Sequence, residues 1–237
     1  MTIADRDIMG GLAKGLAVIE TFAADRPRQS ISDAAAASGL DRATTRRCLL
    51  TLAHYGYADW DGKYFTLTPR VLRLGTACLA SMPTPALVQP ALDALSDRLG
   101  ESTSVSILDG AEIVYIARAA QRKVMSITLM PGSRLPAYCT SMGRVMLAAL
   151  STAEARTRLE SAPRPARTPH TLTGLKELMA ELSHVRAQGF SIIDQEVELG
   201  LCSISVPLAN ARGQVIAALN LGRAAGTEPM AIVAPRL

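Results

Sequence analysis

The chain has 237 residues, of which 49% are hydrophobic and 19% are charged. This composition suits one large domain or two modest ones and excludes global disorder. The net charge of +4 is evenly divided, with 10 Lys/Arg and 8 Asp/Glu in residues 1–75 and 15 and 13 in the rest. A polyanionic partner is therefore permitted but not required, and a DNA-binding argument must rest on local arrangement.

The cysteines and the N-terminus indicate the compartment. The four cysteines show no C-x-x-C spacing, which is typical of reduced core thiols in a cytoplasmic protein rather than of a zinc or redox site. The first ten residues contain acids and no apolar h-region, so no signal peptide is predicted. Every apolar run is too short to span a bilayer. We expect a cytoplasmic protein without a membrane association, a metal or a cofactor.

Three helices are predicted in the first 55 residues. The first, over residues 12–24, follows from apolar residues at helical spacing: Leu12, Leu16, Ile19 and Phe22. Ser30 and Asp33 fit a capping box that opens an alanine-rich helix over residues 31–38. Gly39 suits a left-handed turn, and Asp41 can cap the third helix, over residues 42–55.

The third helix has two faces. Residues at i, i+3, i+4 and i+7 are expected to pack inward: Thr45, Cys48, Leu49 and Leu52. The start of the helix and the neighbouring face hold basic and small side chains that suit phosphates and base edges: Arg42, Ala43, Thr44, Arg46 and Arg47. A short helix, a glycine turn and a second helix of this kind form the helix-turn-helix pattern.

A β-hairpin is predicted directly after this helix, because Asp61-Gly62 separates the aromatic-rich runs 57–60 and 63–67. Such a hairpin forms the wing of a winged helix-turn-helix, with Lys63 at its tip. Arginines on one helix are more often a solvated face, but the order of elements favours DNA binding. The expected contacts are Ser30, Ser32, Arg42, Ala43, Thr44, Arg46, Arg47 and Lys63.

A connecting helix is predicted from Thr68-Pro69, with Thr68 as the cap. Its apolar stripe could pair with a second subunit or pack on its own domain, and Pro83, Pro85 and Pro90 are expected to break the chain up. The predicted organisation is therefore a winged helix-turn-helix domain over residues 1–68, a linker helix over 69–85 and a second domain over 86–237.

The second domain is predicted to be α+β, with a mostly antiparallel sheet and helices on one side. A leucine-rich helix ends at Gly100. Strands are expected at 103–108, 112–118, 124–128, 190–194, 201–208 and 215–222. Helices are expected at 142–150, 152–160 and 174–188.

An anion site is suggested where a loop of small and polar residues enters an apolar helix near Ser141. The N–H groups of Ser141, Met142 and Gly143, together with the helix dipole, would receive a carboxylate. Gly143 would let a ligand approach, and Arg134 or Arg144 could add charge. An equally weighted alternative is that Thr140 or Ser141 simply caps the helix.

Two further features could carry chemistry. The acidic cluster at 194–198 lacks a nearby His, so Asp194 is expected to orient a ligand hydroxyl or to hydrogen-bond the following loop rather than to hold a metal. A hydrolase with Cys139 or Ser141 as nucleophile and His170 as base is disfavoured, because no G-x-S-x-G motif is present.

Several segments together resemble the IclR family of bacterial transcription regulators: 15–20, the turn and Arg-rich helix, 57–67, Ser141–Arg144 and Asp194-x-Glu196-x-x-x-Gly200. The match covers nearly the whole chain. The segment over residues 132–150 is most similar to the branch that controls aromatic-acid catabolism through the β-ketoadipate pathway. The resemblance implies a non-enzymatic regulator with a GAF-like effector domain.

The resemblance also implies partners and a pocket. Dimers would pair through the DNA-binding domain and linker, often as a dimer of dimers on palindromic double-stranded DNA. An aromatic or keto acid would bind between the sheet and the helix near Ser141, with its carboxylate on the N–H groups of Ser141 and Met142. The expected effector contacts are Arg134, Tyr138, Ser141, Met142, Gly143, Asp194, Leu201, Ser203, Asn220 and Gly222.

Three departures from the family pattern bear on these expectations. Ser203 stands where many relatives have Cys, and Asn220 and Gly222 stand where serines are common. The hydrogen-bonding set therefore differs, and the effector's identity stays open. The segment after Gly226 contains two prolines, so the long amphipathic helix with which relatives usually finish is expected to be missing.

Overall fold

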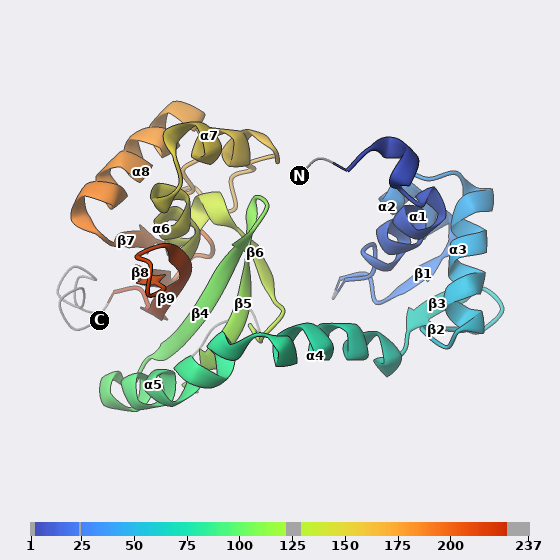
Figure 1. Ribbon diagram of the computed structural model, residues 1–237, viewed down its shortest axis with the longest axis horizontal. Helices are drawn as coiled ribbons and strands as arrows, with labels where there is room; N and C mark the ends of the chain where they lie inside the picture. Colours follow the sequence, from blue (N-terminus) through green and yellow to red (C-terminus); the bar gives the residue numbers. More distant parts are fainter. Residues whose placement is uncertain (1–2, 24, 122–128, 227–237) are drawn as a thin grey trace. The chain divides into compact units, whose positions relative to one another are not determined.

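The computed structural model describes residues 3–23, 25–121 and 129–226. The strand expected at 124–128 and the expectation for the tail at 227–237 lie outside these ranges. The chain divides into two compact units, Met1–Ser81 and Met82–Leu237, whose elements are labelled in Figure 1. The division falls inside the segment predicted as a linker.

The first unit has the winged helix-turn-helix architecture. After the short turn η1 (Asp5–Asp7) come the helices α1 (Gly10–Ile19), α2 (Ile31–Ser38) and α3 (Arg42–His54). The strands β1 (Arg28–Ser30), β2 (Ala58–Trp60) and β3 (Tyr64–Leu67) form an antiparallel sheet in the order β1-β3-β2. β1 was not predicted, because three residues are too few to show a period of two.

The core of the first unit is small and draws on every main element. Its fully enclosed members are Val18, Ala34, Leu49, Ala58 and Phe65. The prediction of a first helix extending to residue 24 is wrong. The helix ends at Ile19, after which the Thr21 hydroxyl donates to the Val18 carbonyl at 2.7 Å and accepts from Gln29 Nε2 at 3.0 Å.

The connection contains the linker helix and the leucine-rich helix that the sequence predicts, and the second ends at Gly100 as expected. The turn η2 (Pro69–Val71) leads into α4 (Leu72–Ser81), and α5 (Pro83–Leu99) follows. Pro83 and Pro85 lie in the first turn of α5, where a missing N–H costs no helical hydrogen bond, and Pro90 is accommodated inside the helix. The helices break at Met82, directly before Pro83, as expected, but the expectation that Pro85 and Pro90 also break the chain is wrong. Within the described residues, no single helix is both long and apolar enough to cross a bilayer.

The second unit is built on a six-stranded antiparallel sheet. Its strands are β4 (Ser102–Asp109), β5 (Glu112–Ala119), β6 (Arg134–Pro136), β7 (Ser191–Asp194), β8 (Leu201–Ala209) and β9 (Val215–Ala224). Their spatial order is β6-β5-β4-β9-β8-β7. The antiparallel α+β prediction is confirmed, and the short strand β6 is the one that sequence periodicity missed.

Helices cover both faces of this sheet, so the expectation of helices on one side is wrong. One face packs against α6 (Ser141–Ala149), with the turn η3 (Ala137–Cys139) at its start and α7 (Thr152–Glu160) and α8 (Leu175–Gln188) behind it. The other face packs against α5 through Leu92, Val105 and Ala217 (Figure 1).

The side chains of β4 alternate between these two faces. Thr103 donates its hydroxyl to the Leu92 carbonyl of α5 at 3.0 Å, and Val105 joins the α5 core. Ser106, on the opposite face, donates its hydroxyl to Met142 Sδ of α6 at 3.0 Å. Because successive residues of a strand point to opposite faces, the serines of β4 lie under α6.

Candidate functional site

Capping interactions fix both helices of the helix-turn-helix. The Ser30 hydroxyl accepts from the Asp33 N–H at 3.3 Å, and the Asp33 carboxylate accepts from the Ser30 N–H at 2.9 Å, which confirms the predicted capping box. Gly39 has a φ of +70° in the turn, and the Asp41 carboxylate accepts from the Thr44 N–H at 2.8 Å. These hydrogen bonds lower the pKa of both carboxyls. The turn and both helix starts are thus locally specified.

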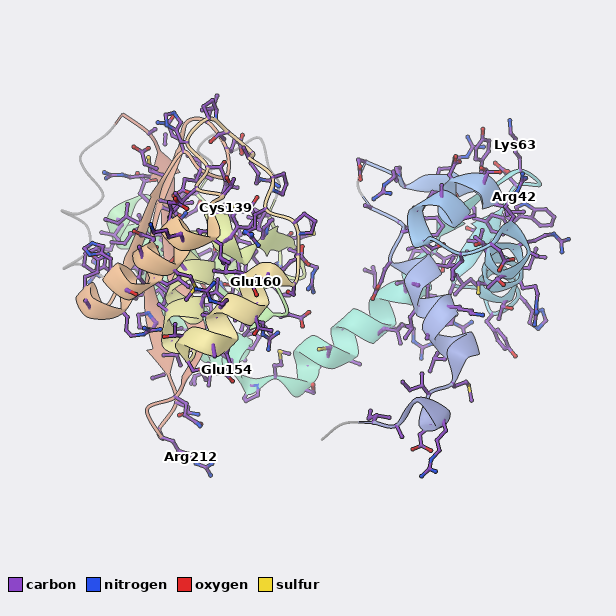
Figure 2. The ribbon with its side chains drawn as sticks, turned by 90° about the horizontal axis from the view of Figure 1, so that it is seen from above. Arg42, Lys63, Cys139, Glu154, Glu160 and Arg212 are labelled. Carbon is purple, nitrogen blue, oxygen red and sulfur yellow. The ribbon has the colours of Figure 1, made fainter. Side chains whose placement is uncertain are left out.

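The predicted DNA contacts are largely open to solvent. On α3, the side chains of Arg42, Ala43, Arg46 and Arg47 are exposed and Thr44 is half-buried. At the start of α2, Ser32 is exposed and Ser30 half-buried, and Lys63 is exposed in the hairpin (Figure 2). On the inward side of α3, Thr45 and Leu49 are buried, whereas Cys48 and Leu52 are half-buried.

Hydrogen bonds to Asp61 close the hairpin turn, and Arg28 of β1 lies beside it. The Asp61 carboxylate accepts from the N–H groups of Lys63 at 2.9 Å and Tyr64 at 2.7 Å and pairs with Arg28, so the pKa of Asp61 is lowered. Arg28 Cζ lies 4.2 Å and Lys63 Nζ 5.0 Å from the centre of the Tyr64 ring. Arg28 was missed because β1 was not predicted.

A cavity of about 30 Å³ lies in the second unit between the sheet and the start of α6. Six of the ten predicted effector contacts border it: Ser141, Met142, Leu201, Ser203, Asn220 and Gly222. Eight bordering residues were not predicted: Ser102, Tyr115, Arg118, Leu129, Leu135, Thr140, Ile193 and Val197. Two of these eight could be recognised in the sequence: Ser102, one of the alternating serines of β4, and Arg118, a charged residue within an apolar strand.

A polar row crosses four strands beneath the cavity, and two of its members, Arg118 and Asn220, border the cavity. Arg118 of β5 is paired with Ser104 of β4, Ser104 with Asn220 of β9, and Asn220 with Ser205 of β8. Directly paired residues in a sheet point to the same face. Arg118 Nη1 donates to the Ser104 hydroxyl at 3.1 Å, which begins the row at its cationic end.

The far end of the row meets α6. The Ser141 hydroxyl lies 2.7 Å from Ser205 Oγ and 2.8 Å from Ser203 Oγ, and Asn220 Nδ2 donates to it at 3.1 Å. Asn220 Nδ2 also donates to the Ile204 carbonyl at 3.2 Å. Because a carbonyl only accepts, the amide nitrogen must face β8. Asn220 Oδ1 therefore points the other way, 3.6 Å from where a Cβ on Gly222 would stand.

Four predicted contacts do not border this cavity, and three of them, Arg134, Tyr138 and Asp194, have partners elsewhere. Arg134 is exposed and pairs with Asp109 at 2.8 Å and Glu112 at 2.7 Å. The Tyr138 hydroxyl donates to the Pro165 carbonyl. Asp194 is exposed, and its carboxylate accepts from Cys202 Sγ at 2.9 Å and from Gln195 Nε2 at 3.2 Å, which lowers its pKa.

Gly143 serves packing rather than ligand approach. A Cβ at this position would lie 2.2 Å from the Ala137 carbonyl oxygen, so only glycine lets η3 pack against α6. Its N–H is also occupied, because it donates to the Thr140 hydroxyl at 3.2 Å. The expected capping by Thr140 is confirmed. Only the N–H groups of Ser141 and Met142 remain for an anion at this helix start.

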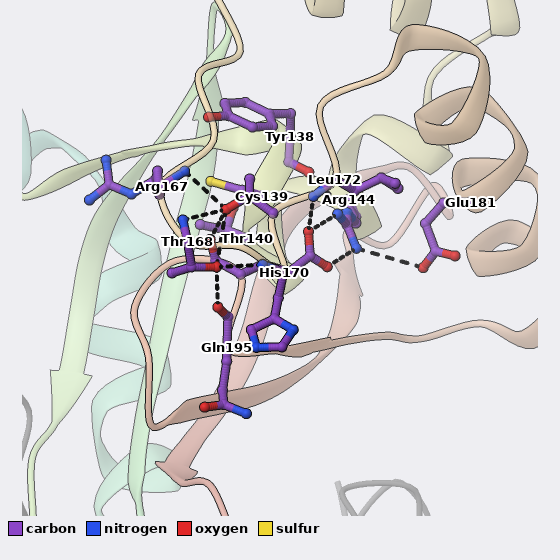
Figure 3. Close-up of polar contacts among 12 residues, drawn as sticks. Tyr138, Cys139, Thr140, Arg144, Arg167, Thr168, His170, Leu172, Glu181 and Gln195 are labelled. Carbon is purple, nitrogen blue, oxygen red and sulfur yellow. Dashed lines mark hydrogen bonds and ion pairs between the residues drawn. The ribbon is translucent and has the colours of Figure 1, made fainter.

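A buried ion pair ties α6 to the loop that follows β7 (Figure 3). Arg144 Nη1 and Nη2 donate to the two Glu196 oxygens at 2.6 and 2.5 Å, and these side chains are 3% and 11% exposed. Arg144 Nε donates to the Tyr138 carbonyl at 2.9 Å, and the Leu172 N–H donates to Glu196 at 2.9 Å. Arg144 is therefore committed to the fold rather than available to a ligand.

The groups considered for chemistry lack an activated nucleophile. Burial raises the pKa of the Cys139 thiol to about 11, so it is almost entirely neutral at physiological pH. The contacts of the Ser141 hydroxyl are two hydroxyls and an amide, none of which is a general base. His170 is exposed (Figure 3). Among the described residues, no group of three or more His, Cys, Asp or Glu could hold a metal ion.

Comparison with known families gives two matches in chain order. Residues 11–62 match the model described as the IclR helix-turn-helix domain. Residues 76–226 match the model described as the bacterial transcriptional regulator IclR C-terminal domain. The second match alone covers more than half of the chain.

Three similar proteins agree with these matches. The Pca regulon regulatory protein of Pseudomonas putida is 46% identical over 223 residues, which are 94% of this chain and 77% of that one. The crystal structure of a transcriptional regulator from Rhodococcus sp. RHA1 has a TM-score of 0.76 and 44% identity, covering 96% of this chain and 91% of that one. An IclR homologue from Microbacterium hydrocarbonoxydans, complexed with 4-hydroxybenzoate, has a TM-score of 0.73 and 25% identity, covering 94% and 93%.

Proposed function

Because the chain belongs to the IclR family of bacterial transcriptional regulators, we propose that an aromatic acid bound in the second unit controls its binding to operator DNA. One observation underlies this proposal. The cavity beneath α6 has apolar walls, a polar floor and a single cationic side chain among its described lining residues. This combination suits a flat, apolar molecule with an acidic group. The 4-hydroxybenzoate complex of the Microbacterium homologue supports the same class.

Binding requires the cavity to widen, and this gives the ligand a means of control. A volume of about 30 Å³ holds a water molecule but not an aromatic ring. Side chains or elements that border the cavity must therefore move to admit the ring. A ligand shifts a conformational equilibrium only by its different affinities for the two states. The wider state is the one that the acid stabilises.

On the DNA side, α3 enters the major groove and the hairpin contacts the backbone. The exposed arginines at the start of α3 and the two cations beside Tyr64 support this arrangement. We assign no chemical transformation of the bound acid to this protein, since Cys139 is neutral and Ser141 lacks a base.

A second copy of the chain pairs along α1. Leu12 and Leu16 are 60% and 47% exposed and line a groove of about 530 Å³ between α1 and α3, which Arg47 also borders. An apolar stripe open to solvent is expected to be covered in a stable assembly. The replacement Leu16→Glu is expected to convert a dimer to a monomer in light scattering without lowering the helix content.

The effector test is a thermal-shift screen of aromatic acids and keto acids that includes protocatechuate and 4-hydroxybenzoate. A true effector at 100 times its Kd stabilises the protein by about 2.7 kcal/mol. Filling the cavity by Asn220→Phe is expected to abolish the shift. If no acid stabilises the folded protein, the aromatic-acid proposal is wrong.

The DNA test compares the wild-type protein with Arg46→Ala on duplexes selected from a random pool. If Arg46 contacts a guanine, the replacement costs about 1–3 kcal/mol and relaxes the preference at one base pair. Equal weakening on all sequences would identify a phosphate contact instead. Arg46 is a sharper probe than Arg47, because Arg47 also borders the α1 groove. Unchanged binding by both Arg46→Ala and Arg47→Ala would exclude α3 as the reading helix.

A further inference from the structure

We propose that Arg118 binds the effector's carboxylate and that Asn220 accepts a hydrogen bond from a hydroxyl at the opposite end of its ring. The polar row would then fix the direction of the ligand across the sheet. This inference rests on the proposed effector function and names the side chains that select the acid.

The charge argument identifies Arg118. A carboxylate that leaves water for an enclosed site needs a charged or strongly donating partner. Among the described residues that border the cavity, Arg118 is the only charged one. It is half-buried, and the contact of Nη1 with Ser104 at 3.1 Å holds its guanidinium at the cavity floor. A guanidinium stays protonated at neutral pH and can engage both carboxylate oxygens.

The geometry of the amide identifies the other end. Asn220 Nδ2 is occupied by Ser141, Ser205 and the Ile204 carbonyl, which leaves Oδ1 as an acceptor turned toward the space above Gly222. Arg118 and Asn220 stand two strands apart in the row, about 10 Å between backbones. Arg118 Nη1 reaches the Ser104 hydroxyl on the strand between them, and Asn220 Oδ1 faces the space above Gly222. An aromatic acid bound above the row would therefore have its carboxylate toward Arg118 and its opposite end toward Asn220.

The rival orientation places the carboxylate on the N–H groups of Ser141 and Met142. Of the three donors expected at that helix start, Gly143 is already bonded to Thr140. The two orientations make opposite predictions for two variants. Arg118→Met removes the cation. Ser141→Pro removes the N–H at the first position of α6, where proline is tolerated, and also the hydroxyl that contacts Ser203, Ser205 and Asn220, so Ser141→Ala, which removes the hydroxyl alone, is its control.

The experiment measures Kd by calorimetry for 4-hydroxybenzoate and for 4-hydroxybenzamide, its neutral analogue. The wild-type protein is expected to prefer the acid. In Arg118→Met, affinity for the acid should fall about 10- to 100-fold, as for loss of a charged hydrogen bond, while affinity for the amide should change little. Arg118→Lys should restore part of the preference. Asn220→Leu should leave the affinity for benzoate, which lacks the hydroxyl, unchanged and should lower the affinity for 4-hydroxybenzoate.

The outcomes separate this inference from the function on which it rests. If the wild-type protein binds the acid and Arg118→Met keeps the full acid-over-amide preference, Arg118 is not the anchor. Loss of that preference in Ser141→Pro alone would establish the rival orientation. If the wild-type protein binds neither compound nor any other acid, the effector function itself fails. Arg118→Gln, which retains a donor for Ser104, replaces Arg118→Met if the latter does not fold.

Discussion

Gly222 leaves a gap without a side chain in the cavity lining, between Ser102 on one neighbouring strand and Ser203 on the other. Its backbone does not require glycine, because its φ lies outside the left-handed region. A Cβ would make ordinary contacts with Asn220 Oδ1 at 3.6 Å and with Leu201 Cδ1 at 4.0 Å. The residue is therefore dispensable for folding and matters for the space available to a ligand.

The replacement Gly222→Ala should separate stability from binding. Stability is expected to stay unchanged or to rise by about 0.4–1 kcal/mol, because alanine restricts the unfolded chain. The methyl group occupies space that the ring needs, so affinity for the acid should fall roughly 10-fold or more. Urea unfolding and calorimetry measure the two effects. Gly75→Ala in α4, which has open space around it, is the control and should leave affinity unchanged.

The cysteines should differ widely in reactivity toward a thiol reagent at pH 8. Cys78 is exposed and should react at the rate of a free thiol. Burial is the main cause that raises the pKa of Cys139 and of Cys202 to about 11, which leaves on the order of one part in a thousand as thiolate at pH 8. Stopped-flow labelling of single-cysteine variants tests this. Fast labelling of Cys139 in the folded protein would contradict its assignment as an inert core thiol.

The same shifts set a dependence of stability on pH. The folded state favours the neutral thiols of Cys139 and Cys202, because their pKa values are raised. This stabilisation of the folded state is fully present below the ordinary thiol pKa and is lost as the pH rises through about 11.

At the scale of elements, the contact between α6 and the loop after β7 depends on the Arg144–Glu196 pair. Val197 and Leu201, on either side of this loop, both border the cavity. The ion pair therefore holds one wall of the cavity against the helix that forms its roof.

Removing one partner of the Arg144–Glu196 pair should lower the free energy of unfolding. Glu196→Gln leaves Arg144 buried with Glu181, at 3.9 Å, as its remaining carboxylate neighbour, and breaking a buried pair costs about 3–5 kcal/mol. The control is Glu160→Gln, which breaks the Arg156–Glu160 pair on α7, whose side chains are about half exposed. That change should cost less than about 0.5 kcal/mol. Equal decreases in the free energy of unfolding by urea would show that the buried pair stabilises the fold no more than the exposed pair.

Periodicity and capping residues predicted the elements well where the signal is local. Ser30, Gly39 and Asp41 determine the helix-turn-helix by contacts within a few residues, and each was visible in the sequence. The three-residue strands β1 and β6 exist through pairing with distant strands, so no local pattern marks them.

The candidate site was predicted only in part, for the same reason. Arg118 joins it through strand register, and Arg134 leaves it through ion pairs with Asp109 and Glu112. Both facts depend on tertiary neighbours rather than on residue type. The resemblance supplied positions on β8 and β9 that local reasoning could not.

At the scale of the whole molecule, the two units have separate hydrophobic cores among the described residues. The cluster around Phe65 and Leu49 belongs to the first unit, and the clusters on either face of the six-stranded sheet belong to the second. Units with separate cores can unfold separately.

Calorimetry should therefore resolve two unfolding transitions. A bound acid at 100 times its Kd stabilises only the second unit, by about 2.7 kcal/mol, so one transition should move and the other should stay. A short operator duplex should instead move the transition of the first unit and leave that of the second unit unchanged. A single transition that moves with either ligand would show that the units unfold as one cooperative body.

The alternation along β4 has a consequence for how such regulators diversify. Ser102, Ser104 and Ser106 face α6, while Thr103 and Val105 pack toward α5. Ser102 borders the cavity, and Ser104 and Ser106 contact its lining residues Arg118 and Met142, so substitutions at the first set change the cavity and leave the packing beneath α5 intact. A lineage that meets a new nutrient can therefore exchange hydroxyls, amides and glycines on one side of a strand. The opposite side keeps the inherited scaffold.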